Sequence, residues 1–420
     1  MRANNSSSLS MFIKQIFSKS RPELSLGLVL IFGSSIGQTF FISLFSGEIR
    51  NDLNLSHGMF GMYYSAATLL SAIVFFGIGK FTDQYNFTFL AIITLLALSG
   101  FAFLISSAET LFILFLSLLG LRLFGQSMLT HIVITSMLRW FSKKKGRALS
   151  VALMGHPIGE AVLPALITFF LTQFTWREIW IGIAICIVVF FLPVLCWLSK
   201  YLKFRSLGQS LNNLSDSKRI SKTSWKRSQV LKDLRFYKII PGLLASPFIV
   251  TGVLFHQIHL IETKSWSLGM FASCYPFFAL SVTGLTLSSG WIIDRFSTVH
   301  LLRFFLLPLA FGLLLMASTD ESYAAPVFMA LMGASTGGAT IIMSTLWVEL
   351  YGSGYIGSIR SMCFSMVVIS TSISPALMGL LLDIGVTLES QFIIFAIYIF
   401  ICSIIFAVLT PSLLINRSPT

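Results

Sequence analysis

Two charged side chains interrupt long apolar stretches of this sequence. Arg122 lies within the stretch 110–138 and Glu160 within the stretch 147–173. A charge in hydrocarbon costs at least about 2.5 kcal/mol, so such residues are rare and usually functional. A guanidinium can hold a carboxylate through two parallel hydrogen bonds, and a carboxyl group whose charge is disfavoured can carry a proton. The two side chains therefore predict an anion-binding or proton-coupling site or, alternatively, a fixed ion pair.

Uncharged polar side chains and histidines lie in the apolar stretches as well. Gln38 and Thr39 follow Gly37 in the stretch 24–48, and Gln126 lies about one helical turn after Arg122. His256 lies in the stretch 237–261, and imidazoles titrate near neutral pH. We expect these four residues, Gln38, Thr39, Gln126 and His256, to contribute to substrate binding or coupling, with hydrogen bonds between helices as the alternative.

The composition requires helices in lipid to position these residues. Of the 420 residues, 55% are hydrophobic and 11% charged, whereas soluble domains carry about 25% charged residues. About 20 apolar residues in a helix cross the hydrocarbon core, and barrel strands would be about half as long with alternating polarity. The sequence therefore predicts an all-α integral membrane protein with twelve spans, at 24–48, 57–80, 87–107, 110–138, 147–173, 177–199, 237–261, 268–292, 299–318, 323–348, 356–383 and 390–411.

The sequence contains none of the short motifs that mark common enzymes and pumps. It has no G-x-x-x-x-G-K-S/T, H-E-x-x-H or C-x-x-C pattern. Its five cysteines are far apart and lie in apolar stretches, which is typical of neither a disulfide framework nor a zinc site. We expect no enzymatic activity, no cofactor and no metal.

The distribution of basic residues predicts the orientation of the chain. The net charge is +13, and most of the basic residues lie in the N-terminal tail and in the segments after the second, fourth, sixth and eighth spans. Cytoplasmic loops are rich in Lys and Arg, so we expect a multi-pass protein of the cell membrane with both termini in the cytoplasm. Charge spread over loops favours contact with anionic lipid, not with nucleic acid.

One long polar segment divides the chain. The predicted organisation is a tail at 1–23, a six-helix bundle at 24–199, a basic cytoplasmic linker at 200–236, a second six-helix bundle at 237–411 and a tail at 412–420. Gly79 and Asp83 follow the second span, and Gly290 and Asp294 follow the eighth, at an offset of 211 residues. This repeat predicts that the two bundles are pseudo-symmetric copies of one unit.

The repeated turn resembles the G-x-x-x-D-R signature of the major facilitator superfamily, and the resemblance extends over nearly the whole chain. The copy Gly290, Asp294 and Arg295 is close to the signature, whereas the copy Gly79 and Asp83 is followed by Gln84. The resemblance implies that Gly79, Asp83, Gly290, Asp294 and Arg295 form a conformational latch.

Two more stretches resemble motifs of the same family. The segment from Arg122 to Gln126 is similar to its intramembrane Arg motif in the fourth span. Its Gly/Pro-rich fifth-span motif, which implies a helix kink, is matched by Gly155, Pro157, Gly159 and Pro164. Glu160 stands where antiporters usually have Pro, which disfavours drug-efflux antiport. Three other segments together resemble the bacterial monocarboxylate-transporter-like branch: Gly37–Thr39 in the first span, Phe124–Ser127 in the fourth and Trp140–Ala148 after it.

The resemblance implies a secondary active transporter that works by alternating access. We expect a small organic anion such as a monocarboxylate as substrate, with protons or another ion as the coupling partner and membrane lipid as the solvent. The expected state is a monomer. The alternatives are a proton-linked exporter of neutral or cationic compounds and a non-transporting membrane sensor.

Overall fold

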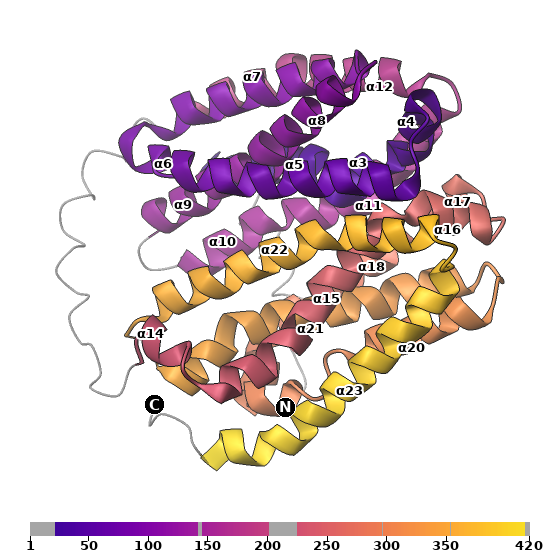
Figure 1. The fold of residues 1–420 in the computed structure, drawn as a ribbon. Helices are drawn as coiled ribbons and strands as arrows, with labels where there is room; N and C mark the ends of the chain where they lie inside the picture. The colour runs from indigo at the N-terminus through magenta and orange to yellow at the C-terminus, as the bar shows by residue number, and fades with distance from the viewer. Residues whose placement is uncertain (1–21, 142–144, 201–224, 296, 353, 416–420) are drawn as a thin grey trace, which may run out of the picture. The chain divides into compact units, whose positions relative to one another are not determined.

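The computed structural model describes residues 22–141, 145–200, 225–295, 297–352 and 354–415. Within these ranges every regular element is a helix (Figure 1), so the predicted all-α class is confirmed. The helices up to residue 199 are α2 (Pro22–Ser34), α3 (Thr39–Ile42), α4 (Ser46–Leu53), α5 (His57–Ile78), α6 (Phe81–Gln84), α7 (Phe87–Ser106), α8 (Leu111–Gly120), α9 (Thr130–Trp140), α10 (Lys145–Leu153), α11 (Gly155–Leu171), α12 (Trp176–Cys186) and α13 (Leu192–Ser199).

The later helices follow the polar segment. They are α14 (Arg227–Val230), α15 (Leu234–Phe255), α16 (Gln257–Thr263), α17 (Leu268–Ala272), α18 (Tyr275–Arg295), α19 (Thr298–Leu301), α20 (Leu307–Ser318), α21 (Ala324–Tyr351), α22 (Ile356–Asp383) and α23 (Leu388–Ile415). Four short segments have other helical geometries: 3₁₀ in η1 (Ser35–Gly37) and η2 (Ser43–Phe45), and π in η3 (Leu121–Leu129) and η4 (Ile187–Phe191).

Ten helices in the described ranges are long and apolar enough to cross a membrane. The first predicted span is a pair of helical segments, Pro22–Gly37 and Thr39–Leu53, bent by 50°, and it makes an eleventh if counted as one span. At the ninth predicted position, 299–318, the apolar helix α20 has only 12 residues. It starts with Pro308 in its first turn, where the missing N–H of proline costs no helical hydrogen bond.

Polar side chains fix where several helices begin. The Asn86 side chain accepts a hydrogen bond from Phe89 N (2.9 Å) at the start of α7. Thr175 and Glu178 form a capping box at the start of α12. Such caps satisfy N–H groups that the first helical turn leaves unpaired.

The described residues fall into two compact units. Unit 1 includes residues up to 41, 70–159 and 173–215, and unit 2 includes 42–69, 160–172 and 216–420. Helices α5 and α11 therefore contribute residues to both units. Because this division cuts across the predicted halves, the arrangement as two six-helix bundles stays a prediction.

The core of unit 1 is built around α7, which packs against α12 and η3. Ser99 Oγ on α7 donates a hydrogen bond to Ala184 O on α12 at 2.9 Å. The rings of Phe41 and Trp180, both buried, meet edge to face with centroids 5.8 Å apart. This packing holds η3 beside the break in the first span.

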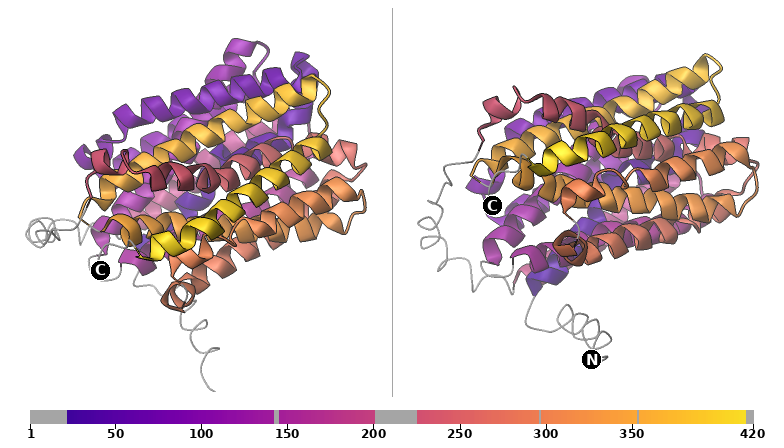
Figure 2. Two further views of the ribbon diagram at one scale, coloured as in Figure 1. Left: turned by 60° about the horizontal axis from the view of Figure 1, so that its bottom comes forward. Right: turned by 90° about the horizontal axis from the view of Figure 1, so that it is seen from below.

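The core of unit 2 consists of long helix pairs: α18 with α21, α20 with α23, and α15 with α22. Figure 2 shows α23 (yellow) lying along orange helices, and α20 is among the helices that pack against it. A buried serine joins one of these pairs: Ser374 Oγ on α22 donates a hydrogen bond to Phe248 O on α15 at 2.6 Å. Each such bond satisfies a hydroxyl in an apolar interior.

Candidate functional site

The first span is broken at Gln38. This residue is extended (φ −83°, ψ 155°) between the 3₁₀ turn that ends at Gly37 and the helix that starts at Thr39. A break in a helix leaves backbone carbonyls without their helical donors, and in a membrane another protein group must satisfy them.

Arg122 supplies a donor at this break. Its side chain is only 2% exposed, and its Nη1 donates to Gly37 O at 3.0 Å and to Thr39 Oγ1 at 3.4 Å. Arg122 lies in the π-helical segment η3, a geometry that is frequent at functional sites. The predicted site residues Arg122 and Thr39 are thus in contact.

Two glycines make this contact possible. A Cβ on Gly37 would lie 2.3 Å from Leu121 O and 2.7 Å from Gln126 N, and a Cβ on Gly125 would lie 2.7 Å from Gly37 Cα. The segments η1 and η3 therefore meet backbone to backbone. Unit 1 gathers four predicted site residues at this place, Gln38, Thr39, Arg122 and Gln126, of which all but Arg122 are half-buried.

Unit 2 holds a second polar group, a buried chain of hydrogen bonds that the sequence did not predict. Tyr275 OH donates to Gln257 Oε1 at 2.7 Å, and Gln257 Nε2 donates to Ser43 Oγ at 2.8 Å. Ser43 Oγ donates in turn to Leu254 O at 2.7 Å. All three side chains are fully buried, and we name them the Tyr275 chain.

Glu160 lies next to this chain. It is half-buried on α11, and its carboxyl group interacts electrostatically with Tyr275. Arg122 belongs to unit 1 and Glu160 to unit 2, so an ion pair between them stays a prediction.

His256 has a structural partner. It is 3% exposed, and its Nε2 lies 3.0 Å from Pro375 O. Because a carbonyl oxygen only accepts, Nε2 carries the proton in this bond. The predicted role of His256 in coupling remains a prediction.

Arg50 and His57 are polar groups that the sequence reasoning missed, because they flank a turn instead of interrupting an apolar stretch. They line a pocket together with Ser46, Phe60, Phe255, His256 and His259. Arg50 Nη1 lies 3.1 Å from His57 Nε2, and the His57 and His259 ring centroids are 4.3 Å apart. This pocket lies in unit 2 between α4, the start of α5 and the junction of α15 with α16, and this end of the unit is here named the His57 end.

Close backbone packing and one carboxylate join α5 to α22 at the His57 end. Cβ atoms on Gly61 and Gly379 would lie 2.5 Å from the carbonyl oxygens of Pro375 and His57. Asp383 Oδ2 accepts hydrogen bonds from Ser56 Oγ (2.6 Å) and Gly58 N (3.0 Å). Asp383 thereby caps the N-terminus of α5, where a negative charge is favourable.

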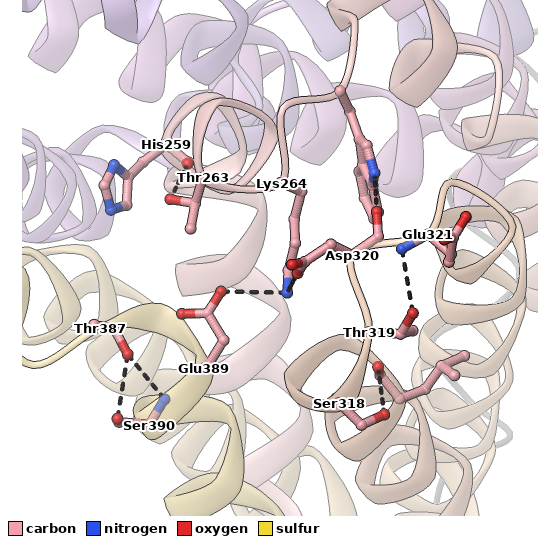
Figure 3. A network of polar contacts seen from close by, with 12 residues as sticks. His259, Thr263, Lys264, Ser318, Thr319, Asp320, Glu321, Thr387, Glu389 and Ser390 are labelled. Carbon is pink, nitrogen blue, oxygen red and sulfur yellow. Dashed lines mark hydrogen bonds and ion pairs between the residues drawn. The ribbon is translucent and has the colours of Figure 1, made fainter.

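A buried lysine after α16 joins two further segments at the same end (Figure 3). Lys264 Nζ lies 2.5 Å from Asp320 Oδ1 and 3.3 Å from Glu389 Oε1. Trp266 Nε1 also donates to Asp320 O at 2.6 Å. The lysine side chain is 2% exposed, whereas Asp320 is 78% exposed, so a buried cation is held between solvated acids.

The predicted latch is described only in part. After Gly79, Thr82 Oγ1 donates to Gly79 O (2.8 Å) and Thr82 O accepts from Arg139 Nη1 (2.6 Å). Gly290, Asp294 and Arg295 lie in α18 and Asp83 in α6, but the side chains of Asp83, Asp294 and Arg295 are outside the described part of the structure. The latch therefore stays a prediction.

The helix at the predicted kink is interrupted at Met154, between α10 and α11. A Cβ on Gly155 would lie 2.5 Å from Leu28 O, so α11 begins in close contact with α2. Pro157 and Gly159 lie in the following turns, and Pro164 is inside α11. The role of these four residues in a kink stays a prediction.

No metal site is found among the described residues, since no three His, Cys, Asp or Glu side chains are arranged to hold an ion.

A sequence model described as Major Facilitator Superfamily matches residues 27–366. No curated protein matches the chain.

Solved transporters share the fold. A bacterial homolog of the human lysosomal transporter Spinster, inward-facing and unoccupied, aligns with TM-score 0.70 and 14% identity over 96% of this chain and 100% of its own. Its occupied form aligns with TM-score 0.68 and 15% identity over 100% of both chains. A mutant of the nucleoside transporter NupG aligns with TM-score 0.67 and 14% identity over 93% of this chain and 98% of its own.

Proposed function

Because the chain belongs to the Major Facilitator Superfamily, we propose that it is a secondary active transporter of a small organic anion, coupled to protons by alternating access. The family consists of multi-pass membrane transporters and is generally not enzymatic. The observation that carries the proposal is the broken first span with Arg122 at the break. Substrate sites of secondary transporters form at discontinuous helices near the middle of the membrane.

The anion is proposed from the chemistry around the break. Arg122 Nη1 donates to Gly37 O and Thr39 Oγ1, and the guanidinium is a planar cation of the kind that recognises carboxylates. A carboxylate could bind the same group bidentately, with Thr39, Gln38 and Gln126 as neutral contacts. A monocarboxylate is the smallest substrate with this chemistry.

The coupling proton is proposed to bind Glu160. Its electrostatic interaction with Tyr275 supports this role, since a change of charge on Glu160 acts on a residue that belongs to a continuous series of hydrogen bonds. Those bonds join segments 214 positions apart in the sequence, Ser43 in η2 with Gln257 in α16. Proton binding could therefore be linked to conformation.

A second candidate is a neutral or cationic compound exported against protons. The uncharged hydroxyl and amide groups of the Tyr275 chain favour this candidate. The hydrogen bond from Arg122 to the backbone oxygen of Gly37 favours it as well. In that case Arg122 stabilises the break and does not touch the substrate. A membrane sensor without transport is the least favoured alternative.

The proposed setting is the cell membrane, with a monomer organised as two six-helix bundles and both termini in the cytoplasm. The abundance of basic residues in the tail and linker supports this orientation. The His57 end then faces the outside.

The test is uptake of labelled small carboxylates into proteoliposomes, with and without an imposed pH gradient. We expect gradient-dependent uptake that falls at least about tenfold in Arg122→Gln, with partial uptake in Arg122→Lys. Lys200→Gln is the matched control, because it removes an exposed positive charge at the end of α13.

Each outcome assigns the substrate class. Carboxylate uptake that Arg122→Gln leaves intact would remove Arg122 from the site. Absence of carboxylate uptake by folded protein would remove the anion proposal, and a panel of neutral and cationic solutes under the same gradient would then test the second candidate.

A further inference from the structure

Three histidines and an arginine meet at the His57 end, and neither the proposed substrate nor the proposed coupling proton uses them. The His57 ring centroid is 4.3 Å from that of His259 and 6.0 Å from that of His256. Arg50 Nη1 is 3.1 Å from His57 Nε2. His57 and His259 are half-buried.

The contact with Arg50 fixes where His57 holds its proton. A guanidinium has no lone pair to offer, so it can only donate. Nε2 of His57 must therefore be the acceptor, which places the ring proton on Nδ1. In this arrangement His57 is neutral.

A second proton on His57 is incompatible with the contact. It would occupy Nε2, remove the acceptor of Arg50 and leave two cationic groups face to face. The neighbouring ring of His259 carries no negative charge that could compensate the two cations.

Three of the acids around the cluster are already engaged or exposed, and the fourth, Glu48, is half-buried with its Oε2 lacking a hydrogen-bond partner. Asp383 on α22 faces His57 and Arg50, but its Oδ2 accepts from Ser56 and Gly58. Glu389 faces His259 and pairs with Lys264. Glu262 faces both Arg50 and His259 from an exposed position. Glu48 faces Arg50 from the same helix.

The members of the cluster come from elements that lie far apart in the sequence. Arg50 is on α4 and His57 starts α5, whereas His256 and His259 belong to the α15–α16 region and Asp383 ends α22. Alternating access requires a state in which such contacts at one end of the protein open. When α4 and α5 separate from α16 and α22, His57 becomes hydrated and is free to bind a second proton.

We propose that His57 is a proton-binding site that excludes its second proton while the His57 end is closed and takes one up when this end opens. Because the proton binds the open state better, acid on that side shifts the population toward opening. The site would respond to the medium at the His57 end, separately from a coupling proton on Glu160. The inference rests on alternating access and is independent of the substrate.

Hydrogen exchange on the whole protein in lipid nanodiscs tests this site without a substrate. We expect exchange of the backbone amides at 58–62 and 377–383, after correction for the intrinsic rate, to rise at least about threefold between pH 8 and pH 5.5. The rise should begin near the ordinary pKa of an exposed imidazole, about 6.5, and continue as the pH falls below it. His57→Gln keeps an acceptor for Arg50 and cannot titrate, so its corrected exchange should not change with pH.

Two further variants keep the test decisive. His131→Gln removes a histidine of unit 1 and should keep the full pH response. In Arg50→Gln, His57 can bind its proton in the closed state too, so the response should become smaller even if His57→Gln does not fold. A wild-type protein without pH response, or a full response in both His57→Gln and Arg50→Gln, would overturn the proposal. Neither result would bear on carboxylate transport.

Discussion

The Arg122 guanidinium donates a hydrogen bond to the carbonyl oxygen of Gly37 at 3.0 Å, across the break in the first span. One buried arginine thus satisfies a backbone group that the broken helix exposes, and it places a cation where a substrate could bind. Stabilising the break and binding an anion make different demands on the side chain, so substitutions can separate them.

Arg122→Lys should separate the two roles. A lysine can still donate to Gly37 O but lacks the planar fork for a carboxylate. We expect most of the folding stability to remain in Arg122→Lys, while Arg122→Gln loses about 1.5–3 kcal/mol with the charged hydrogen bond. Thermal unfolding in detergent measures the stability, and proteoliposome uptake measures the transport. Equal losses of both quantities in the two variants would favour a purely structural arginine.

Gly37→Ala should destabilise unit 1. Its Cβ would lie 2.3 Å from Leu121 O and 2.8 Å from Gly125 Cα, where backbone must move. We expect a loss of at least about 1–3 kcal/mol, the usual cost of overpacking, seen as a lower melting temperature. Gly182→Ala is the control, because no atom lies within 4 Å of its Cβ; the added methyl should be neutral or stabilising. An unchanged melting temperature in Gly37→Ala would contradict the close contact of η1 and η3.

The sequence predicted what depends on hydrophobic run length and on charge in apolar stretches. The length of the hydrophobic runs predicts the helical class and most spans. The charge of Arg122 and Glu160 distinguishes them within their apolar stretches. The break at Gln38 was not predicted, because Gly37, Gln38 and Thr39 do not interrupt the hydrophobic run that defines the span. Tyr275, Gln257 and Ser43 were missed as a chain, since their hydrogen bonds join residues up to 214 positions apart. His57 follows a turn, where a polar residue is ordinary.

Asp383→Asn should loosen the His57 end. The carboxylate accepts two hydrogen bonds at the start of α5, and charge-assisted bonds are about twice as strong as neutral ones. We expect about 1 kcal/mol of lost stabilisation, and thus faster hydrogen exchange of the amides at 58–61. Glu321→Gln, an exposed acid at the same end, should leave that exchange unchanged. If both variants exchange like the wild type, Asp383 does not hold α5.

Tyr275→Phe should disturb the Tyr275 chain. The substitution removes the hydroxyl that donates to Gln257 Oε1 at 2.7 Å, and a buried acceptor that loses its donor costs about 1–3 kcal/mol. We expect lower thermal stability and slower gradient-driven transport. Tyr237→Phe is the matched control, because that exposed tyrosine donates to a backbone carbonyl at 2.9 Å. Wild-type transport by Tyr275→Phe would show that the hydroxyl plays no part in coupling.

Removing Lys264 and removing its two acidic partners should lower the folding stability by different amounts. The lysine is buried, whereas Asp320 is 78% and Glu389 26% exposed. Lys264→Met leaves two acids that water can solvate and fills the space with an apolar chain, so the loss should be about 1 kcal/mol or less. The double variant Asp320→Asn with Glu389→Gln instead leaves a buried ammonium group without a counter-ion, and we expect about 3–5 kcal/mol.

Thermal unfolding of these variants, with Lys232→Met as an exposed control in the same unit, measures the difference. The triple variant decides the cause, because it removes the acids and the lysine together. If a stranded cation is what destabilises the double variant, adding Lys264→Met should recover most of the lost stability. A triple variant as unstable as the double variant would mean that the acids stabilise this end through other contacts.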